Sequence, residues 1–194
     1  MDQVFAYIDR HIDEYIHALE DLCSQPSLSA EGRGLPEMAD LLACTMKAWG
    51  IESKVIPTNG APVVYGEVRG QSERAILLYG HYDVQPTDPL DEWLSPPFEP
   101  TVRDGRLYAR GVSDDKGDVL ARIAAVSALQ AVNGQLPFTI KFLIEGEEEI
   151  DGASVFSFIR EHPELLACEV CFLEGPEHAR VLHVLVTGWS RPQY

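Results

Sequence analysis

Apolar positions recur along the chain at helical spacing in some segments and as short continuous runs in others. Between residues 3 and 22 they fall at 5, 8, 12, 15, 16 and 19, which predicts a helix with one apolar face, ended by Gln-Pro-Ser at 25–27. Similar patterns predict helices at 35–49, 116–130 and 152–165. Short apolar runs predict strands at 51–58, 62–70, 75–80, 138–146, 169–175 and 180–188.

Turn signals separate these elements. Asp104-Gly105 lies between two short β-like runs and predicts a hairpin over 101–110, whereas the Pro-rich stretch 83–102 predicts an extended surface loop. Asn133-Gly134 ends the helix that begins at 116. Because strands and helices alternate, the predicted fold is α/β, a mixed, mostly parallel sheet with helices on both faces.

The composition of the chain indicates its size class and excludes some kinds of binding partner. The 194 residues fit one domain with a sizeable core, and their net charge of −16 argues against nucleic acid and anionic membranes, which need basic patches. No apolar run is long enough to span a bilayer, and the acidic, amphipathic N-terminus is unlike a signal peptide. The scattered cysteines fit a reducing cytosol. Cys168 and Cys171 form a C-x-x-C that could bind metal, but Cys171 as an inward strand residue is the simpler interpretation.

Potential metal ligands follow four of the strand-like runs. They are His81, Asp114, Glu149 and Glu174. Loops at the carboxyl ends of strands in an open α/β sheet converge on one crevice, so these side chains are expected to meet there. One imidazole with several carboxylates suits Zn²⁺, Mn²⁺ or Co²⁺. More carboxylates are present than one metal needs, which suggests two metals, or one metal and a general base.

The neighbouring residues admit structural and catalytic interpretations. Asp83 could orient a metal-binding His81 through the other ring nitrogen, although both could instead be surface residues of a turn. In Gly-Val-Ser-Asp-Asp-Lys-Gly at 111–117, the two acids could cap the following helix, or one could bridge two cations. Lys116 could pair with the neighbouring acid. The acidic run at 145–149 could be a solvated loop, or one glutamate could bind metal while its neighbour acts as general base.

Three motifs in order resemble one metallopeptidase family. They are LLYGHYDVQP, a WxxxPFxPxxxDGxLYxRGxxDDKG pattern, and a strand ending in EGEEE. The family includes cytosolic dipeptidases, carnosinases, acetylornithine deacetylase, succinyl-diaminopimelate desuccinylase, aminoacylase and carboxypeptidase G. The resemblance implies hydrolysis of a dipeptide, or of an N-acyl amino acid, at two divalent metal ions, with Zn²⁺ expected and Mn²⁺ or Co²⁺ as alternatives.

The resemblance also implies a role for each site residue. His81 and Glu174 would bind one metal and Glu149 the other, while Asp114 would bridge them. Asp83 would orient His81, and Glu148 would be the general base. After Glu149 the chain reads Ile-Asp-Gly where relatives often have Ser-Gly-Ser, so Glu147 and Glu148 could be base and ligand instead.

Family members are considerably longer than this chain. They carry a lid or dimerisation domain and a further metal-binding histidine. We therefore expect residues 1–194 to be the N-terminal part of a metallopeptidase catalytic domain, inactive alone, from a cytoplasmic parent that forms a homodimer. A non-catalytic metal-binding fragment is the alternative.

Overall fold

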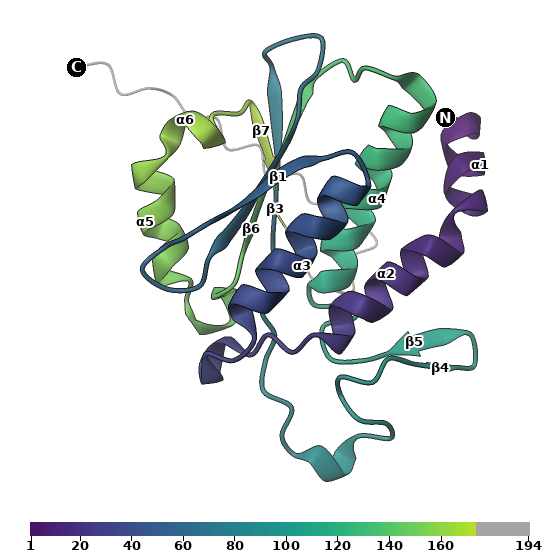
Figure 1. The fold of residues 1–194 in the computed structure, drawn as a ribbon, viewed down its shortest axis with the longest axis vertical. Helices are drawn as coiled ribbons and strands as arrows, with labels where there is room; N and C mark the ends of the chain where they lie inside the picture. The colour runs from purple at the N-terminus through teal and green to yellow at the C-terminus, as the bar shows by residue number, and fades with distance from the viewer. Residues whose placement is uncertain (174–194) are drawn as a thin grey trace.

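The fold is built on one five-stranded sheet, with a separate two-stranded hairpin (Figure 1). The computed structural model describes residues 1–173. The sheet has the order β1-β2-β6-β3-β7. Its strands are β1 (Glu52–Ile56), β2 (Val63–Val68), β3 (Ala75–His81), β6 (Thr139–Glu145) and β7 (Val170–Phe172). The helices are α1 (Asp2–Arg10), α2 (Ile12–Ser24), α3 (Leu35–Ala48), α4 (Lys116–Asn133), α5 (Ala153–Glu161) and α6 (Pro163–Leu166), with short 3₁₀ turns η1 (Ser29–Glu31), η2 (Leu90–Glu92) and η3 (Glu148–Ile150).

The pairing of the strands gives a mixed sheet, as predicted. Strand β3 is parallel to both β6 and β7, whereas β2 is antiparallel to β6 and to β1. In the β3–β6 register His81 lies opposite Glu145, the last residue of each strand. Polar residues that follow β3 and β6 therefore lie at the same edge of the sheet.

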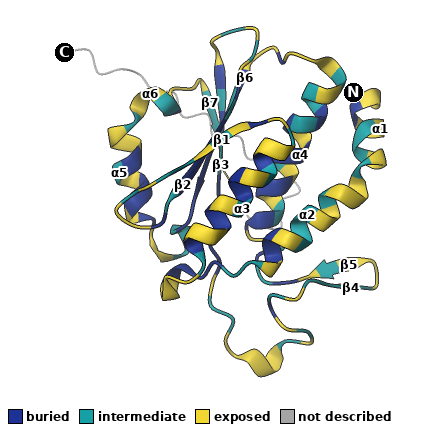
Figure 2. Ribbon diagram, in the orientation of Figure 1, coloured by how far each residue is buried: buried dark blue, intermediate teal, exposed yellow. Residues whose placement is uncertain are grey.

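Helices cover both faces of the sheet, which confirms the predicted layers (Figure 2). Alternating side chains of β6 show the reason: Phe142 and Ile144 pack with α2, α3 and α4, whereas Leu143 packs with α5. Successive residues of a strand point to opposite faces, so a strand that is apolar at nearly every position needs cover on both sides.

Two predicted helices are each divided in the structure. The helix expected at 3–22 breaks at His11, whose ring Nδ1 lies 2.8 Å from the carbonyl oxygen of Tyr7. Phe5 and Ile12 on its predicted apolar face remain exposed. The helix expected at 152–165 ends at Glu161 and restarts at Pro163. Proline lacks the amide proton that would continue the helix, although it fits a first turn.

The turn predictions between β3 and α4 are confirmed. Strands β4 (Thr101–Arg103) and β5 (Arg106–Tyr108) form the hairpin, with Asp104 and Gly105 at φ of 50° and 72°. Positive φ at both central positions is the requirement of the tight hairpin turn that Asp-Gly favours. Helix α4 ends at Asn133, before Gly134 at φ 72°.

The strand predicted at 180–188 lies outside the described residues. None of the helices in residues 1–173 combines the length and apolar character that crossing a bilayer requires.

The cysteines of the chain differ sharply in burial. Cys23 is completely buried at the end of α2, Cys44 and Cys168 are exposed, and Cys171 is half-buried on β7, where it packs against the α5 side of the sheet. Burial raises the pKa of the Cys23 thiol to about 11, although nearby Lys116 opposes that rise. The packing of Cys171 agrees with its interpretation as an inward strand residue.

We expect iodoacetamide at pH 8 to label Cys44 and Cys168 in the native protein and to leave Cys23 unmodified. The reagent needs access and a thiolate, and Cys23 offers neither. Peptide mapping by mass spectrometry measures each site, and the same reaction in urea should label all four cysteines. Equal labelling of Cys23 and Cys44 without denaturant would contradict the buried position of Cys23.

Candidate active site

His81 lies at the centre of the candidate site, at the carboxyl end of β3. Its side chain is buried, with Nε2 3.0 Å from Asp114 Oδ1 and Nδ1 3.2 Å from Asp83 Oδ1. Glu148 Oε2 lies 3.9 Å from the same Nε2. The structure thus brings together His81 and Asp114, two of the four predicted metal ligands, with the carboxylates of Asp83 and Glu148 beside them.

Asp83 is fully buried, and its carboxylate contacts three other residues at this edge of the sheet. Its Oδ1 faces His81 Nδ1 and accepts from the amide of Glu148 at 3.2 Å, while its Oδ2 accepts from the amide of Glu149 at 3.1 Å. One carboxylate therefore orients the imidazole and holds the turn that carries both glutamates. The alternative in which Asp83 and His81 are surface residues is wrong.

The two adjacent acids before α4 have different surroundings. Asp114 reaches His81 Nε2, and its side chain is half exposed. Asp115 is buried, and its Oδ2 accepts from the backbone amide of His81 at 3.1 Å rather than capping the helix. Asp115 thus fixes the backbone of the residue whose ring Asp114 contacts. The residue pattern left these roles open, although the family resemblance gave the metal-binding role to Asp114 alone.

Lys116 does not pair with a neighbouring acid as the sequence suggested. Its buried Nζ donates to the carbonyl oxygens of Leu22 and Gln25, at 2.9 and 2.7 Å, where α2 ends. Burial lowers the pKa of this amine to about 8, against smaller opposing effects of Cys23 and Asp83. A cation at the carboxyl end of a helix satisfies carbonyls that have no partner within the helix. Lys116 therefore ties α2 to the loop that carries Asp114.

The glutamates after β6 point in different directions. Glu148 faces His81, whereas the carboxylate of Glu149 accepts a 2.6 Å hydrogen bond from Gln85. The pKa of Glu149 is raised, foremost by burial and also by Asp114. Glu147 turns away and accepts from the backbone amides of Ala61 and Ser154, at 2.9 and 3.2 Å. The acidic run is therefore not simply a solvated loop.

A further buried carboxylate belongs to Glu145, the first residue of the acidic run, to which the sequence assigned no role of its own. It accepts from the hydroxyl of Tyr79 at 2.8 Å and from the amide of Glu147 at 3.1 Å. Burial raises its pKa, against the lowering effect of those two hydrogen bonds. Its position as the last residue of a buried strand was the available signal. Gln85 gave no such signal, because nothing in its local sequence indicates a partner 64 positions away.

The residues present fit a divalent cation. When His81 carries its ring proton on Nδ1, facing Asp83, its Nε2 is a hydrogen-bond acceptor, as is Asp114 Oδ1. Two acceptor atoms 3.0 Å apart repel each other unless a positive group lies between them. Two ligand atoms about 2.1 Å from one tetrahedral cation lie roughly 3.4 Å apart, close to that separation. Among residues 1–173 no group of three or more His, Cys, Asp or Glu side chains is placed to hold a metal ion. Glu174 lies outside the described residues.

Comparison with known proteins identifies the family. Residues 77–189 match the model of Peptidase family M20/M25/M40. The chain belongs to this family. It is 34% identical over 181 residues to human Beta-Ala-His dipeptidase, covering 84% of this chain and 36% of the relative. It is 42% identical over 156 residues to succinyl-diaminopimelate desuccinylase from Dechloromonas aromatica, covering 78% of this chain and 41% of that enzyme.

The solved structures agree with this assignment. An M20 family metallo-carboxypeptidase from Sulfolobus solfataricus superposes with a TM-score of 0.81 at 38% identity, covering 84% of this chain and 37% of that one. The resemblance inferred from the three motifs is thereby confirmed, as is the fold class. The chain spans well under half the length of each of these relatives.

The Ile-Asp-Gly departure from the family pattern has a local structural effect. Asp151, the middle residue of that triplet, ends η3 with φ at 72°, a left-handed conformation that glycine adopts freely. The turn that follows Glu148 and Glu149 is therefore formed with an aspartate at its left-handed position.

We expect Asp151→Val to lower the free energy of unfolding by about 1–2 kcal/mol relative to Asp151→Gly, because a β-branched side chain is strained in the left-handed region. Urea unfolding followed by circular dichroism measures the difference. Equal midpoints for the two variants would show that the turn relaxes to another conformation.

Proposed function

We propose that this protein contributes the metal-binding and base residues of a metal-dependent amide hydrolase that cleaves dipeptides. The observation that carries the proposal is the buried His81 ring, held between Asp83 and Asp114 with Glu148 beside it. Family membership supports hydrolysis, and a dipeptidase among the relatives supports the substrate class.

In this proposal two divalent cations, with Zn²⁺ as the preferred identity, would be held by His81, Asp114, Glu149 and Glu174. Asp114 would bridge them with its two oxygens. When bound, such cations polarise a carbonyl and make water more acidic. Imidazole and carboxylate ligands accept Zn²⁺, Mn²⁺ and Co²⁺ alike, so the ligand types leave all three as candidates.

The residues of the chain then have separate tasks. Asp83 holds the His81 ring in one orientation, with Nε2 toward the cation position. Glu148 takes a proton from the attacking water and delivers it to the nitrogen of the leaving amine. Glu147 is a poor candidate for the base, because both of its oxygens accept hydrogen bonds from backbone amides away from His81. This geometry supports the assignment of Glu148 as base and Glu149 as ligand.

A second substrate class is favoured by one finding. The desuccinylase from Dechloromonas aromatica is 42% identical over its matched region, higher than the 34% of the human dipeptidase. Hydrolysis of an N-acyl amino acid uses the same proton transfers, so the described residues serve either substrate. The free cysteines support a reducing, cytosolic location, and a homodimer remains an expectation from the resemblance.

Metal analysis with a substrate panel tests the proposal. The 194-residue chain, and any longer product of the same reading frame, is incubated with Zn²⁺, Mn²⁺ or Co²⁺ and assayed on dipeptides and on N-acetyl and N-succinyl amino acids. Metal-dependent dipeptide cleavage that exceeds deacylation supports the first assignment, and the reverse preference supports the second. Failure of every form to bind metal would refute the proposed function.

A further inference from the structure

We infer that Glu147 is a positioning residue, which holds the turn at 145–152 so that Glu148 and Glu149 reach Asp83 and His81. The inference deepens the proposed function, because a metal site at His81 is what the positioning would serve. The carboxylate of Glu147 accepts hydrogen bonds from two backbone amides of other segments rather than facing the His81 ring.

The contacts of Glu147 link three segments of the chain. Its Oε1 accepts from the amide of Ala61 in the β1–β2 loop, and its Oε2 accepts from the amide of Ser154 in the first turn of α5. Its own amide donates to the buried Glu145 at 3.1 Å. Its carbonyl oxygen accepts from the amides of Ile150 and Gly152, at 3.0 and 2.8 Å. Side chain and backbone of this one residue therefore define the turn.

The β1–β2 loop approaches Glu147 unusually closely. A Cβ on Gly60 would lie 1.9 Å from Glu147 Oε1, so a side chain at position 60 would displace this carboxylate from its present position. Charge-assisted hydrogen bonds from backbone amides to a carboxylate are stronger than those between neutral groups. The close approach and the two amide bonds show that the loop is fitted to this carboxylate.

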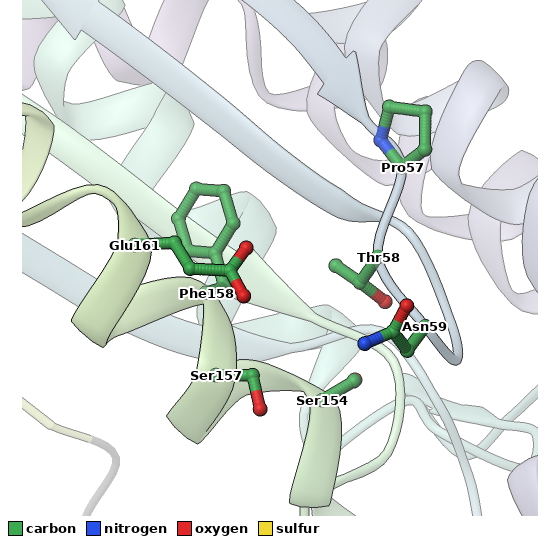
Figure 3. Close-up of a pocket in the computed structure, with 7 residues that line it drawn as sticks. All are labelled: Pro57, Thr58, Asn59, Ser154, Ser157, Phe158 and Glu161. Carbon is green, nitrogen blue, oxygen red and sulfur yellow. The ribbon is translucent and has the colours of Figure 1, made fainter.

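A polar cavity lies beside the contacts of Glu147. Its volume is about 210 Å³, and Figure 3 shows Thr58 and Asn59 of the β1–β2 loop on one side with Ser154 and Ser157 of α5 on the other. Apolar contacts join the same region, because Val63 at the start of β2 packs in one cluster with Val155 and Phe158 of α5. The carboxylate of Glu147 therefore adds a polar connection beside an apolar one, and its loss should loosen the turn without separating the two segments.

The position of the turn is transmitted to the candidate metal site through two amides. Those of Glu148 and Glu149, the residues directly after Glu147, donate to the two oxygens of Asp83. Asp83 in turn orients His81. If the turn loosens, the Asp83 carboxylate loses two partners and holds the imidazole less firmly, although the carbonyl oxygen of Asp83 still lies 3.1 Å from the ring Nδ1. Glu147 thus acts on the site through the backbone, without touching a cation or substrate.

Calorimetric titration with Zn²⁺ and amide hydrogen exchange by NMR test the inference together. We expect Glu147→Ala to weaken Zn²⁺ binding about tenfold, the lower end of the effect usual for residues that support metal ligands. The amides of Glu148 and Glu149 should exchange about tenfold faster in the metal-free variant, because their acceptor is no longer fixed. Glu147→Gln, which keeps one acceptor oxygen, should fall between Ala and wild type.

Two controls separate positioning from a general loss of stability. Glu73→Ala removes an exposed glutamate and should change neither measurement. Ile123→Val removes a methyl group from the buried core and should lower the unfolding midpoint while leaving the Zn²⁺ affinity and the two exchange rates near wild type.

The outcomes distinguish this inference from the proposed function. If wild type binds Zn²⁺ and Glu147→Ala binds it equally well with unchanged exchange at Glu148 and Glu149, the positioning role is refuted while the metal site stands. If wild type binds no Zn²⁺, the metal site fails, and the exchange rates of the two amides alone decide whether Glu147 positions the turn.

Discussion

Glu148→Gln should leave metal binding close to that of wild type and slow amide hydrolysis by about 10²–10⁴-fold in whichever form of the protein is active, the usual loss for a general base. Glutamine has the shape of glutamate but cannot take a proton from water. Glu148 Oε2 lies 3.9 Å from His81 Nε2, beside the expected cation rather than at direct hydrogen-bond distance from the ring.

Steady-state kinetics and metal content of the same preparations check this expectation. Glu92→Gln is the matched control, because Glu92 is exposed in η2 and the same substitution there should change neither quantity. Loss of metal along with activity would make Glu148 a ligand. Unchanged turnover in Glu148→Gln would show that the base is a different residue, and Glu147→Gln would then be the variant to measure.

Asp83→Ala should weaken Zn²⁺ binding by about 100-fold, the upper end of the effect usual for a residue that orients a metal ligand. It should also lower the free energy of unfolding by about 3 kcal/mol, because each buried donor left without an acceptor costs about 1–3 kcal/mol. The donors are the amides of Glu148 and Glu149, whereas the ring of His81 keeps the carbonyl oxygen of residue 83 at 3.1 Å from its Nδ1. The fully buried position of Asp83 leaves no easy access for water to replace the carboxylate.

Calorimetric titration and urea unfolding give the two numbers. Asp91→Ala, at an exposed position of η2, serves as the control and should be neutral in both. Asp83→Asn keeps one carbonyl oxygen and should lose less than the alanine variant. An alanine variant with wild-type Zn²⁺ affinity would mean that His81 is held by other contacts, and the orienting role of Asp83 would be wrong.

The strands up to β7 and the helices α3 and α4 lie close to the positions that the sequence predicted, because apolar spacing and turn residues are local signals. The hairpin at Asp104-Gly105 and the end of α4 before Gly134 followed from backbone conformations that few residues adopt. The divided helices at His11 and Pro163 show the limit of that reasoning, since spacing alone does not reveal where a helix is interrupted.

The convergence of His81 and Glu148 was predictable from topology as well as from the motifs. Both follow strands of the sheet, and His81 and Glu145 end adjacent parallel strands in the same register. Loops that follow parallel strands lie at one edge of the sheet, so the sequence pattern is enough to place these two residues near one another. Asp114 is placed differently, because β5, the strand before it, belongs to the separate two-stranded hairpin, and Asp114 lies just before α4.

The sequence by itself indicated which chemical groups gather at this edge, because residue types and the positions of strands along the chain are written in local patterns. Only the tertiary structure decided how neighbouring carboxylates divide their tasks. Asp114 reaches the ring of His81 while Asp115 binds its backbone, and Glu148 faces the ring while Glu147 binds Ala61 and Ser154. Adjacent residues of one type have the same local preferences, so their roles depend on partners from distant parts of the chain, which only folding brings within hydrogen-bond distance.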